Sequence, residues 1–202
     1  MNTATVPGAA KENPAPEGKD KNDDVGDVCY RWWRQALGPE TGRGRAARAR
    51  LRKAASAVEA IQVEETFELY KALDRKPDTE TLALIAISLA QIKENTAQKA
   101  AERFGRKNGD TRLLSDLRFQ RLVRTPDPAE LVTPLRRALK VIDDRANICD
   151  LARDLYYWNE ETRIRWCFEY YGGGPVPTNE THPAPEHTET DKTKANKEET
   201  AS

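Results

Sequence analysis

Hydrophobic residues between positions 28 and 171 recur every three or four residues, the spacing of helices with one buried face. Residues 131–142 show the pattern best. Their leucines fall on one side of a helix, and Arg136, Arg137 and Lys140 fall on the other. No segment reads as a strand. The sequence therefore predicts an all-α fold, a compact helical bundle of about seven to nine helices.

Residues 79–92 differ from the other helical segments because they are apolar on nearly every side. That pattern is typical of a helix in the middle of a bundle, covered by its neighbours. Further along the chain, Asn108 and Gly109 mark a turn. The same periodicity predicts helices at residues 28–37, 42–55, 64–73, 98–105, 116–124, 128–142, 148–158 and 160–171.

Capping residues mark where several of these helices begin. Asp127 followed by Pro128 is a typical start, because the carboxylate accepts a first-turn N–H and proline fits the first helical position. Asn159 is expected to cap the last helix in the same way. Pro134 lies inside a predicted helix, where proline costs roughly 3 kcal/mol. The helix either kinks there or restarts with Thr133 as its cap.

The spacing also assigns a buried face to individual helices. We interpret Trp32 and Trp33 as core anchors rather than platforms for base stacking, because nothing in the sequence sets an exposed face of either ring apart. The helix at 42–55 is predicted to bury Ala47, Leu51 and Ala54, and Val58 continues the same stripe. The predicted core face of the helix at 64–73 is Phe67, Tyr70 and Leu73. That of the helix at 160–171 is Ile164, Cys167, Phe168 and Tyr171.

Both ends of the chain have few large apolar residues. Residues 1–27 and 172–202 cannot bury enough surface to offset the entropy of ordering, so we predict disordered tails around a helical domain at 28–171. The formal charge of the whole chain is zero, but both tails are acidic. The helical domain holds 27 Lys and Arg against 21 Asp and Glu. A neutral total thus hides a basic body suited to an anionic partner.

The most basic segment runs from Arg43 to Lys53 and contains no acidic residue. On a helix, Arg45, Arg48 and Arg52 share one flank. Like charges at this spacing repel by a few tenths of a kcal/mol per pair, so an anionic ligand is expected to compensate. The alternative is that solvent screens the repulsion.

A second row of guanidinium groups is formed by Arg118, Arg121 and Arg124, which follow one another every three residues. The planar guanidinium stays charged at any usable pH and matches phosphate oxygens in geometry. Such a row suits a nucleic-acid backbone. An ordinary solvated helix face is the competing interpretation.

The sequence lacks the residues of common catalytic sites. His182 and His187 both lie in the predicted C-terminal tail, and there is no phosphate-binding glycine loop or zinc-ligand spacing. We therefore expect no enzyme activity, no metal and no cofactor. The three cysteines lack close spacing, which is typical of reduced thiols in a cytoplasmic protein, with two of them buried. The longest apolar run, residues 82–90, is too short to cross a membrane.

Taken in order, the segments resemble the small subunit, the CasB family, of the type I-E CRISPR surveillance complex called Cascade. Each segment alone is only an amphipathic helix, so the resemblance rests on their order and spacing across residues 28–171. The chain departs from the family pattern in two places. Residues 96–99 stand where the family usually has a turn of small residues, and Pro134 lies inside what is commonly an unbroken helix. The matching segments are CYRWWRQAL (29–37), RARLRKA (48–54), TFELYKAL (66–73), RFQRLVRTPDPAELVTPLRRALKVI (118–142) and ICDLARDLYYWNEETRIRWCFEYY (148–171).

The resemblance implies an all-helical, non-catalytic subunit that sits as two copies in Cascade. Its partners would be the other Cascade subunits, the guide RNA, and the target and non-target DNA strands, without a membrane. Binding to nucleic-acid backbone would stabilise the R-loop in antiviral defence. Carried over by position, the expected nucleic-acid-binding residues are Arg45, Arg48, Arg52, Lys53, Arg118, Arg121, Arg124, Arg136, Arg137 and Lys140.

Two other functions compete with this one. A helical DNA-binding regulator would need a recognition helix with base-reading side chains near its N-terminus, and the arginine rows suit phosphates better than base edges. A structural helical adaptor would use the same arginines on acidic proteins, without contact to nucleic acid.

Overall fold

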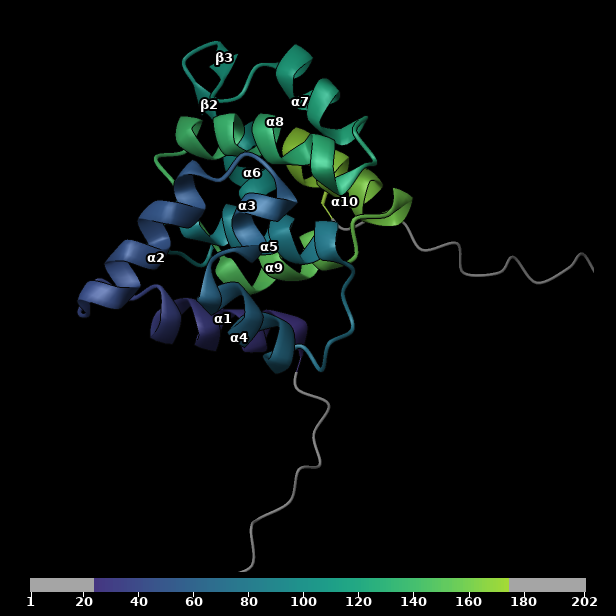
Figure 1. Cartoon of the computed structure of the whole chain (residues 1–202). Coiled ribbons are helices and arrows are strands. Elements are labelled where there is room, and N and C mark those ends of the chain that lie inside the picture. Colours follow the sequence, from purple (N-terminus) through teal and green to yellow (C-terminus); the bar gives the residue numbers. More distant parts are fainter. Residues whose placement is uncertain (1–23, 175–202) are drawn as a thin grey trace, which may run out of the picture.

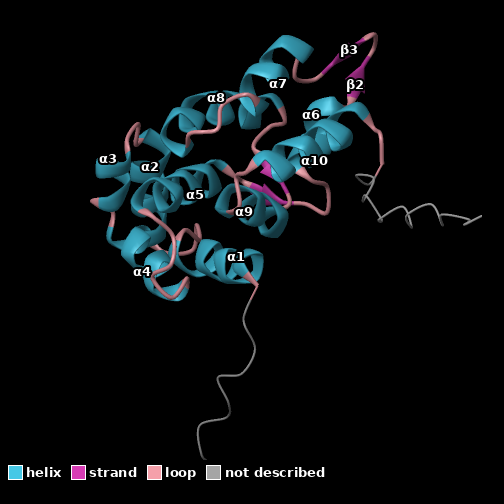
Figure 2. Cartoon of the chain, turned by 90° about the vertical axis from the view of Figure 1, so that its right-hand side faces the viewer, coloured by secondary structure: helices cyan, strands magenta, loops and turns pink. Residues whose placement is uncertain are grey.

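The computed structural model describes residues 24–174, and the predicted tails lie almost wholly outside this range. The first helix begins at Val25, inside the segment predicted as the N-terminal tail, and Asp24 caps it. Ten helices are present between residues 24 and 174 (Figures 1 and 2). They are α1 (Val25–Ala36), α2 (Gly42–Lys53), α3 (Ala57–Ile61), α4 (Glu64–Ala72), α5 (Thr79–Gln91), α6 (Ala100–Gly105), α7 (Asp116–Val123), α8 (Pro128–Val141), α9 (Ile148–Tyr156) and α10 (Glu160–Tyr171).

The all-α prediction is confirmed, and the number of helices exceeds the expected range by one. The extra helix is α3, whose single turn and a half is too short to show a period. None of the helices within residues 24–174 is long and apolar enough to cross a membrane. Of the three free thiols, only Cys29 is fully buried, and Cys149 and Cys167 are partly exposed, so the prediction of two buried cysteines was wrong.

Helix α5 is the centre of the bundle, as its sequence predicts. Residues 81–91 are buried on all sides. Helices α2, α3, α4, α8 and α9 pack against it. In both views α8 lies above α5, and α1 and α4 lie below it (Figures 1 and 2). Helices α2 and α8 therefore cover two sides of the same buried helix.

Four two-residue strands, which the sequence analysis did not predict, join the helices. β2 (Lys107–Asn108) and β3 (Thr111–Arg112) form a hairpin across the expected turn, with Gly109 at φ +67°. β1 (Glu94–Asn95) and β4 (Arg145–Ala146) pair in parallel. This second pair fastens the segment after α5 to the segment after α8. Strands of two residues are too short for alternation to appear in a sequence.

Helix α8 runs without interruption through Pro134. The Asp127 carboxylate accepts the Ala129 N–H at 2.8 Å, and Pro128 occupies the first turn, as expected. The alternative in which a new helix starts at Thr133 is therefore excluded. The predicted cap Asn159 also forms, because its side chain accepts the Thr162 N–H at 2.9 Å.

The buried faces of α4 and α10 differ from the predicted ones. In α4, Phe67 is 46% exposed, and Glu65, Thr66 and Leu69 face the core. In α10, Trp166 and Tyr170 are buried instead of Ile164 and Tyr171. In α10, polar partners explain why Trp166 and Tyr170 are the buried residues. The Trp166 Nε1–H donates to Asp154 at 2.8 Å, and the Tyr170 hydroxyl donates to the Leu114 carbonyl at 2.6 Å, so both large rings can be buried at little cost.

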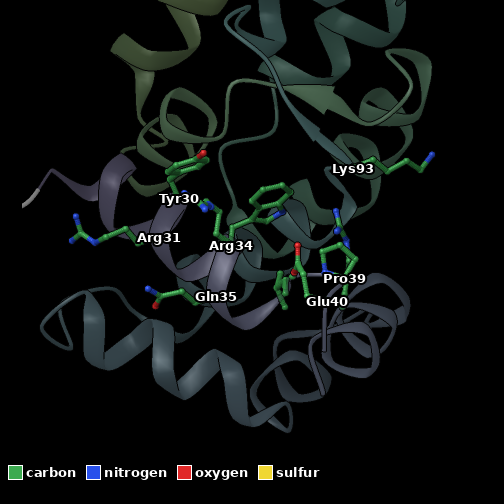
Figure 3. A pocket seen from close by; sticks show the side chains of 11 residues that line it. Tyr30, Arg31, Arg34, Gln35, Pro39, Glu40 and Lys93 are labelled. Carbon is green, nitrogen blue, oxygen red and sulfur yellow. The ribbon is translucent and has the colours of Figure 1, made fainter. Parts of the chain in front are cut away.

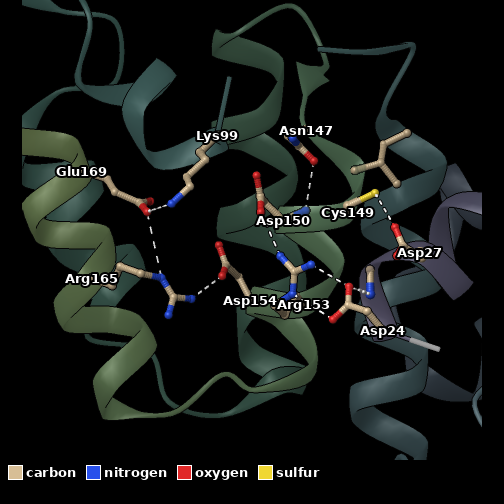
Figure 4. A network of polar contacts seen from close by, with 12 residues as sticks. Asp24, Asp27, Lys99, Asn147, Cys149, Asp150, Arg153, Asp154, Arg165 and Glu169 are labelled. Carbon is tan, nitrogen blue, oxygen red and sulfur yellow. Dashed lines mark hydrogen bonds and ion pairs between the residues drawn. The ribbon is translucent and has the colours of Figure 1, made fainter. Parts of the chain in front are cut away.

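A polar network holds α10 against α6 and α9 (Figure 4). Lys99 pairs with Glu169 at 2.7 Å, and Arg165 pairs with Asp154. Burial raises the pKa of both carboxyl groups, and the paired cations offset only part of that effect. The network thus compensates for charges that would otherwise be costly inside the bundle.

Helices α6 and α10 approach so closely at Gly105 that a Cβ added there would overlap the backbone carbonyl of Tyr170. We expect Gly105→Ala to lower the free energy of unfolding by about 1–3 kcal/mol, because backbone on both sides has to move. Gly42→Ala is the matched control, since a Cβ there meets nothing within 4 Å. Urea denaturation of both variants tests this, and equal stabilities would contradict the close packing.

Candidate nucleic-acid interface

Helix α2 buries a narrow stripe and exposes most of its arginines. Ala47, Leu51 and the following Ala54 are buried against α5. Val58, predicted to continue the stripe, is 69% exposed because α2 ends at Lys53 and the chain turns before α3. Gly44 packs against the Gly38 carbonyl and its N–H is taken by the Thr41 hydroxyl, so its small size serves packing.

Not every basic residue of α2 is available to a ligand. Arg43 is held by three carboxylates, with its Nε 2.7 Å from Glu65 and its Nη2 2.7 Å from Glu68 and 3.6 Å from Glu64. The Arg45 side chain donates to the Pro39 carbonyl at 2.7 Å and remains exposed at the start of the helix. The cations nearer the C-terminal end of α2 lie instead near a single buried carboxylate, that of Asp144.

There, the buried carboxylate of Asp144 attracts basic residues from two segments, α2 and the segment after α5. Its Oδ2 lies 2.8 Å from Lys93 and 3.8 Å from Arg52, while its Oδ1 has no hydrogen-bond partner in the structure. Arg48 is close by and donates to the Ala90 carbonyl at 3.2 Å. Burial lowers the pKa of Arg48, as does the charge of Arg52, and Asp144 partly offsets both. One carboxylate facing three cations leaves the region positive.

Helix α8 brings further basic residues to the same end of α2. The Arg136 guanidinium donates to the carbonyl of Ala54, directly after α2. Burial lowers the pKa of Arg136, with a partial offset from Glu59, and its Nε has no partner. Lys140 lies one turn beyond Arg136 on the same side of α8, next to the exposed Arg137.

These residues form what we call the basic track. Helix α2, which carries part of it, runs along the edge of the bundle towards α8 (Figure 1). Its members are Arg48, Arg52, Lys53, Lys93, Arg136, Arg137 and Lys140.

Three of the predicted contacts to nucleic acid, Arg48, Arg52 and Arg136, thus lie around the C-terminal half of α2, together with Lys93, which was not among the predicted residues. Lys53, Arg137 and Lys140 are exposed residues next to them along α2 and α8. The sequence could have pointed to Lys93 as a candidate, because it is the first charged residue after the apolar segment 82–92.

The arginines of α7 form a separate row. Arg118, Arg121 and Arg124 are exposed, and α7 packs on α8 and α10. No hydrogen bond or ion pair among residues 24–174 links them to the basic track. The structure therefore places the predicted site residues in two groups on neighbouring helices, with Arg45 at the far end of α2.

Most of these cations have no competing anion among residues 24–174. Among the predicted residues, only Arg52 lies within 4 Å of a carboxylate. The predicted residues that make no side-chain hydrogen bond or ion pair within the described part of the chain are Lys53, Arg118, Arg121, Arg124, Arg137 and Lys140. Unpaired guanidinium and ammonium groups in rows can bind phosphate oxygens. Between residues 24 and 174 no cluster of His, Cys, Asp and Glu could hold a metal ion.

Comparisons with known proteins agree with this fold. Residues 47–171 match the family model described as CRISPR-associated protein Cse2. No curated protein sequence matches the chain. The crystal structure of CasB from Thermus thermophilus is similar, with a TM-score of 0.57 and 21% identity, covering 73% of this chain and 97% of that one. A chain of E. coli Cascade bound to a PAM-containing double-stranded DNA target has a TM-score of 0.52 and 20% identity, covering 71% and 91%.

Arg136 and Arg137 are adjacent in sequence but differ in their structural roles. We expect Arg136→Ala to lower the free energy of unfolding by about 1–3 kcal/mol, because the Ala54 carbonyl loses its donor and a buried stem is removed. Arg137→Ala should change it by no more than about 0.5 kcal/mol, since the side chain is exposed and has no partner within residues 24–174. Urea denaturation compares them, and an unaffected Arg136→Ala variant would show that its contact to Ala54 contributes nothing.

Proposed function

The chain belongs to the CRISPR-associated Cse2 family, and we propose that it is the non-catalytic small subunit of a type I-E Cascade complex. It binds the sugar-phosphate backbone of the guide RNA–target DNA heteroduplex and of the displaced DNA strand, and thereby stabilises the R-loop. Its partners are the other Cascade subunits and a second copy of itself. Two supports are the family match and the fold shared with a chain of E. coli Cascade bound to a DNA target.

The observation that carries the proposal is the basic track. Arg52 of α2 and Lys93 after α5 share Asp144, Arg136 of α8 contacts the end of α2, and Lys53, Arg137 and Lys140 have no ion pair within residues 24–174. A protein that read sequence would direct side chains at base edges. Rows of Arg and Lys spaced along helices instead suit phosphates, which repeat regardless of sequence.

The energetics of R-loop formation explain why such contacts matter. The heteroduplex that forms is about as stable as the DNA duplex that it replaces, so contacts to backbone can decide the balance. No acid–base chemistry is needed for this role. Arg and Lys side chains on the surface stay protonated near neutral pH and hold phosphates by charge alone.

Titration of the full chain with single-stranded and duplex DNA at several salt concentrations tests the proposal. We expect binding that is indifferent to sequence, with log K falling against log salt by about 0.9 for each phosphate neutralised on duplex DNA. A strong preference for one operator would instead support a regulator. Absence of binding, both alone and in the assembled complex, would support an adaptor that contacts only proteins.

Single substitutions in the two arginine groups test which residues contact phosphate. Arg137→Ala and Arg121→Ala should each weaken binding to all sequences and reduce the salt slope by up to about one unit, because one phosphate contact is lost. Lys71→Ala is the control. Lys71 is exposed on α4, on the opposite side of α5 from α8 (Figures 1 and 2). An unchanged slope for Arg137→Ala or Arg121→Ala would remove that residue from the interface.

A further inference from the structure

A cleft of about 720 Å³ is lined by α1, by the loop at 37–40 that follows it, and by two residues of the basic track, Arg48 and Lys93. Tyr30 and Trp33 line it together with Arg34, Arg48 and Lys93. In the close view, Tyr30 and Arg34 project from α1 on one side, and Pro39, Glu40 and Lys93 lie on the other (Figure 3). The volume is in the range of sites that hold small ligands. Arg48 and Lys93 belong both to the cleft and to the basic track.

The two tryptophans of α1, which the sequence analysis interpreted alike, have different surroundings. Trp32 is 5% exposed, and its Nε1–H donates to the Glu65 carbonyl at 2.8 Å, so it is a core anchor. Trp33 is only partly buried and lines the cleft. Its Nε1–H donates to the Leu89 carbonyl at 3.1 Å, which fixes the ring on α5. Trp33 is therefore a rigid aromatic surface with access to solvent.

The aromatic rings of the cleft are nearly parallel and carry cations. The rings of Tyr30 and Trp33 have centroids 6.4 Å apart and planes 16° apart. The Arg34 guanidinium lies 5.9 Å from the Tyr30 centroid, and that of Arg48 lies 5.5 Å from the Trp33 centroid. Parallel rings flanked by guanidinium planes are the surfaces on which unpaired bases stack.

The charge of the cleft favours an anionic ligand, and its aromatic rings favour a ligand with a planar group. Its lining includes four Arg and Lys residues and one carboxylate, that of Glu40. The buried Nη2 of Arg48 has no hydrogen-bond partner, so the protein does not fully satisfy that guanidinium. A nucleotide combines a flat ring with a negative phosphate. Bases inside a duplex are stacked on each other and unavailable, so the ligand has to be single-stranded.

We propose that this cleft holds a nucleobase of single-stranded nucleic acid, stacked on Tyr30 and Trp33. This inference rests on the proposed function and extends it, because it adds contact with a base to contact with the backbone. Phosphates flanking the base lie on Arg48 and Lys93, where the cleft opens onto the basic track. The stacking is tolerant of sequence, since every base has a flat face.

The test compares two ligands with equal phosphate number: a fifteen-nucleotide thymidine oligomer and an abasic oligomer of the same length. Fluorescence anisotropy with the full chain measures both affinities. We expect the thymidine oligomer to bind about five-fold more tightly or better, the lower end of the range for one base stacked on an aromatic ring. Tyr30→Ala should abolish that preference, and Tyr30→Phe, which keeps the ring, should retain it.

Two further variants keep the test decisive. Arg34 is exposed, so Arg34→Ala is expected to fold and to reduce the preference even where Tyr30→Ala does not fold. Phe67→Ala removes an aromatic ring that is 46% exposed on α4 and should leave the preference unchanged.

The outcomes separate the cleft from the proposed function. Equal binding of the two oligomers would overturn the proposal that the cleft holds a base, and would leave the proposed contacts to the nucleic-acid backbone unaffected. Failure of both to bind overturns both proposals. Equal weakening of both ligands by Tyr30→Ala or Arg34→Ala overturns the cleft as well, because the side chain would then act on the basic track and not on a base.

Discussion

The structure depends on the complete burial of α5. A helix that is apolar on every side cannot lie at a surface, so residues 81–91 need neighbours all around them. Five helices supply this cover, among them α2 and α8. Each of these two helices is apolar on one side only. Docking that side on α5 leaves the basic side of each facing solvent, and the end of α2 meets α8 at the contact between Arg136 and Ala54. The basic track is thus a consequence of how the core is covered.

Much of the fold could be predicted from the sequence, because helical periodicity is a local signal. The caps Asp127 and Asn159, the buried α5 and the turn at Gly109 all follow from residues close together in the chain. The buried face of α10 could not be predicted in this way. Burying Trp166 requires Asp154 from another helix as the acceptor of its N–H, and no spacing within α10 shows that partner.

The site shows the same division between local and distant information. Sequence spacing shows that Arg48, Arg52 and Arg136 face away from the apolar stripes. It does not show that Arg43 is taken up by Glu65, or that Arg136 reaches a carbonyl 82 residues earlier in the chain. Which cations are left unpaired is decided only when distant helices pack. For the same reason the sequence could not separate Trp32 from Trp33, since the difference lies in what covers each ring.

The ion pair between Lys93 and Asp144 has a consequence for the thermodynamics of any anion that reaches it. Lys93 already has a carboxylate at 2.8 Å, so a phosphate arriving there displaces one anion in favour of another. Small cations condensed on the nucleic acid are released whichever basic residue neutralises the phosphate. At Lys93 that entropic gain is set against the loss suffered by Asp144, which is left with Arg52 at 3.8 Å as its remaining partner. Lys53 and Arg137 have no ion pair to give up among residues 24–174, so the gain there is kept in full.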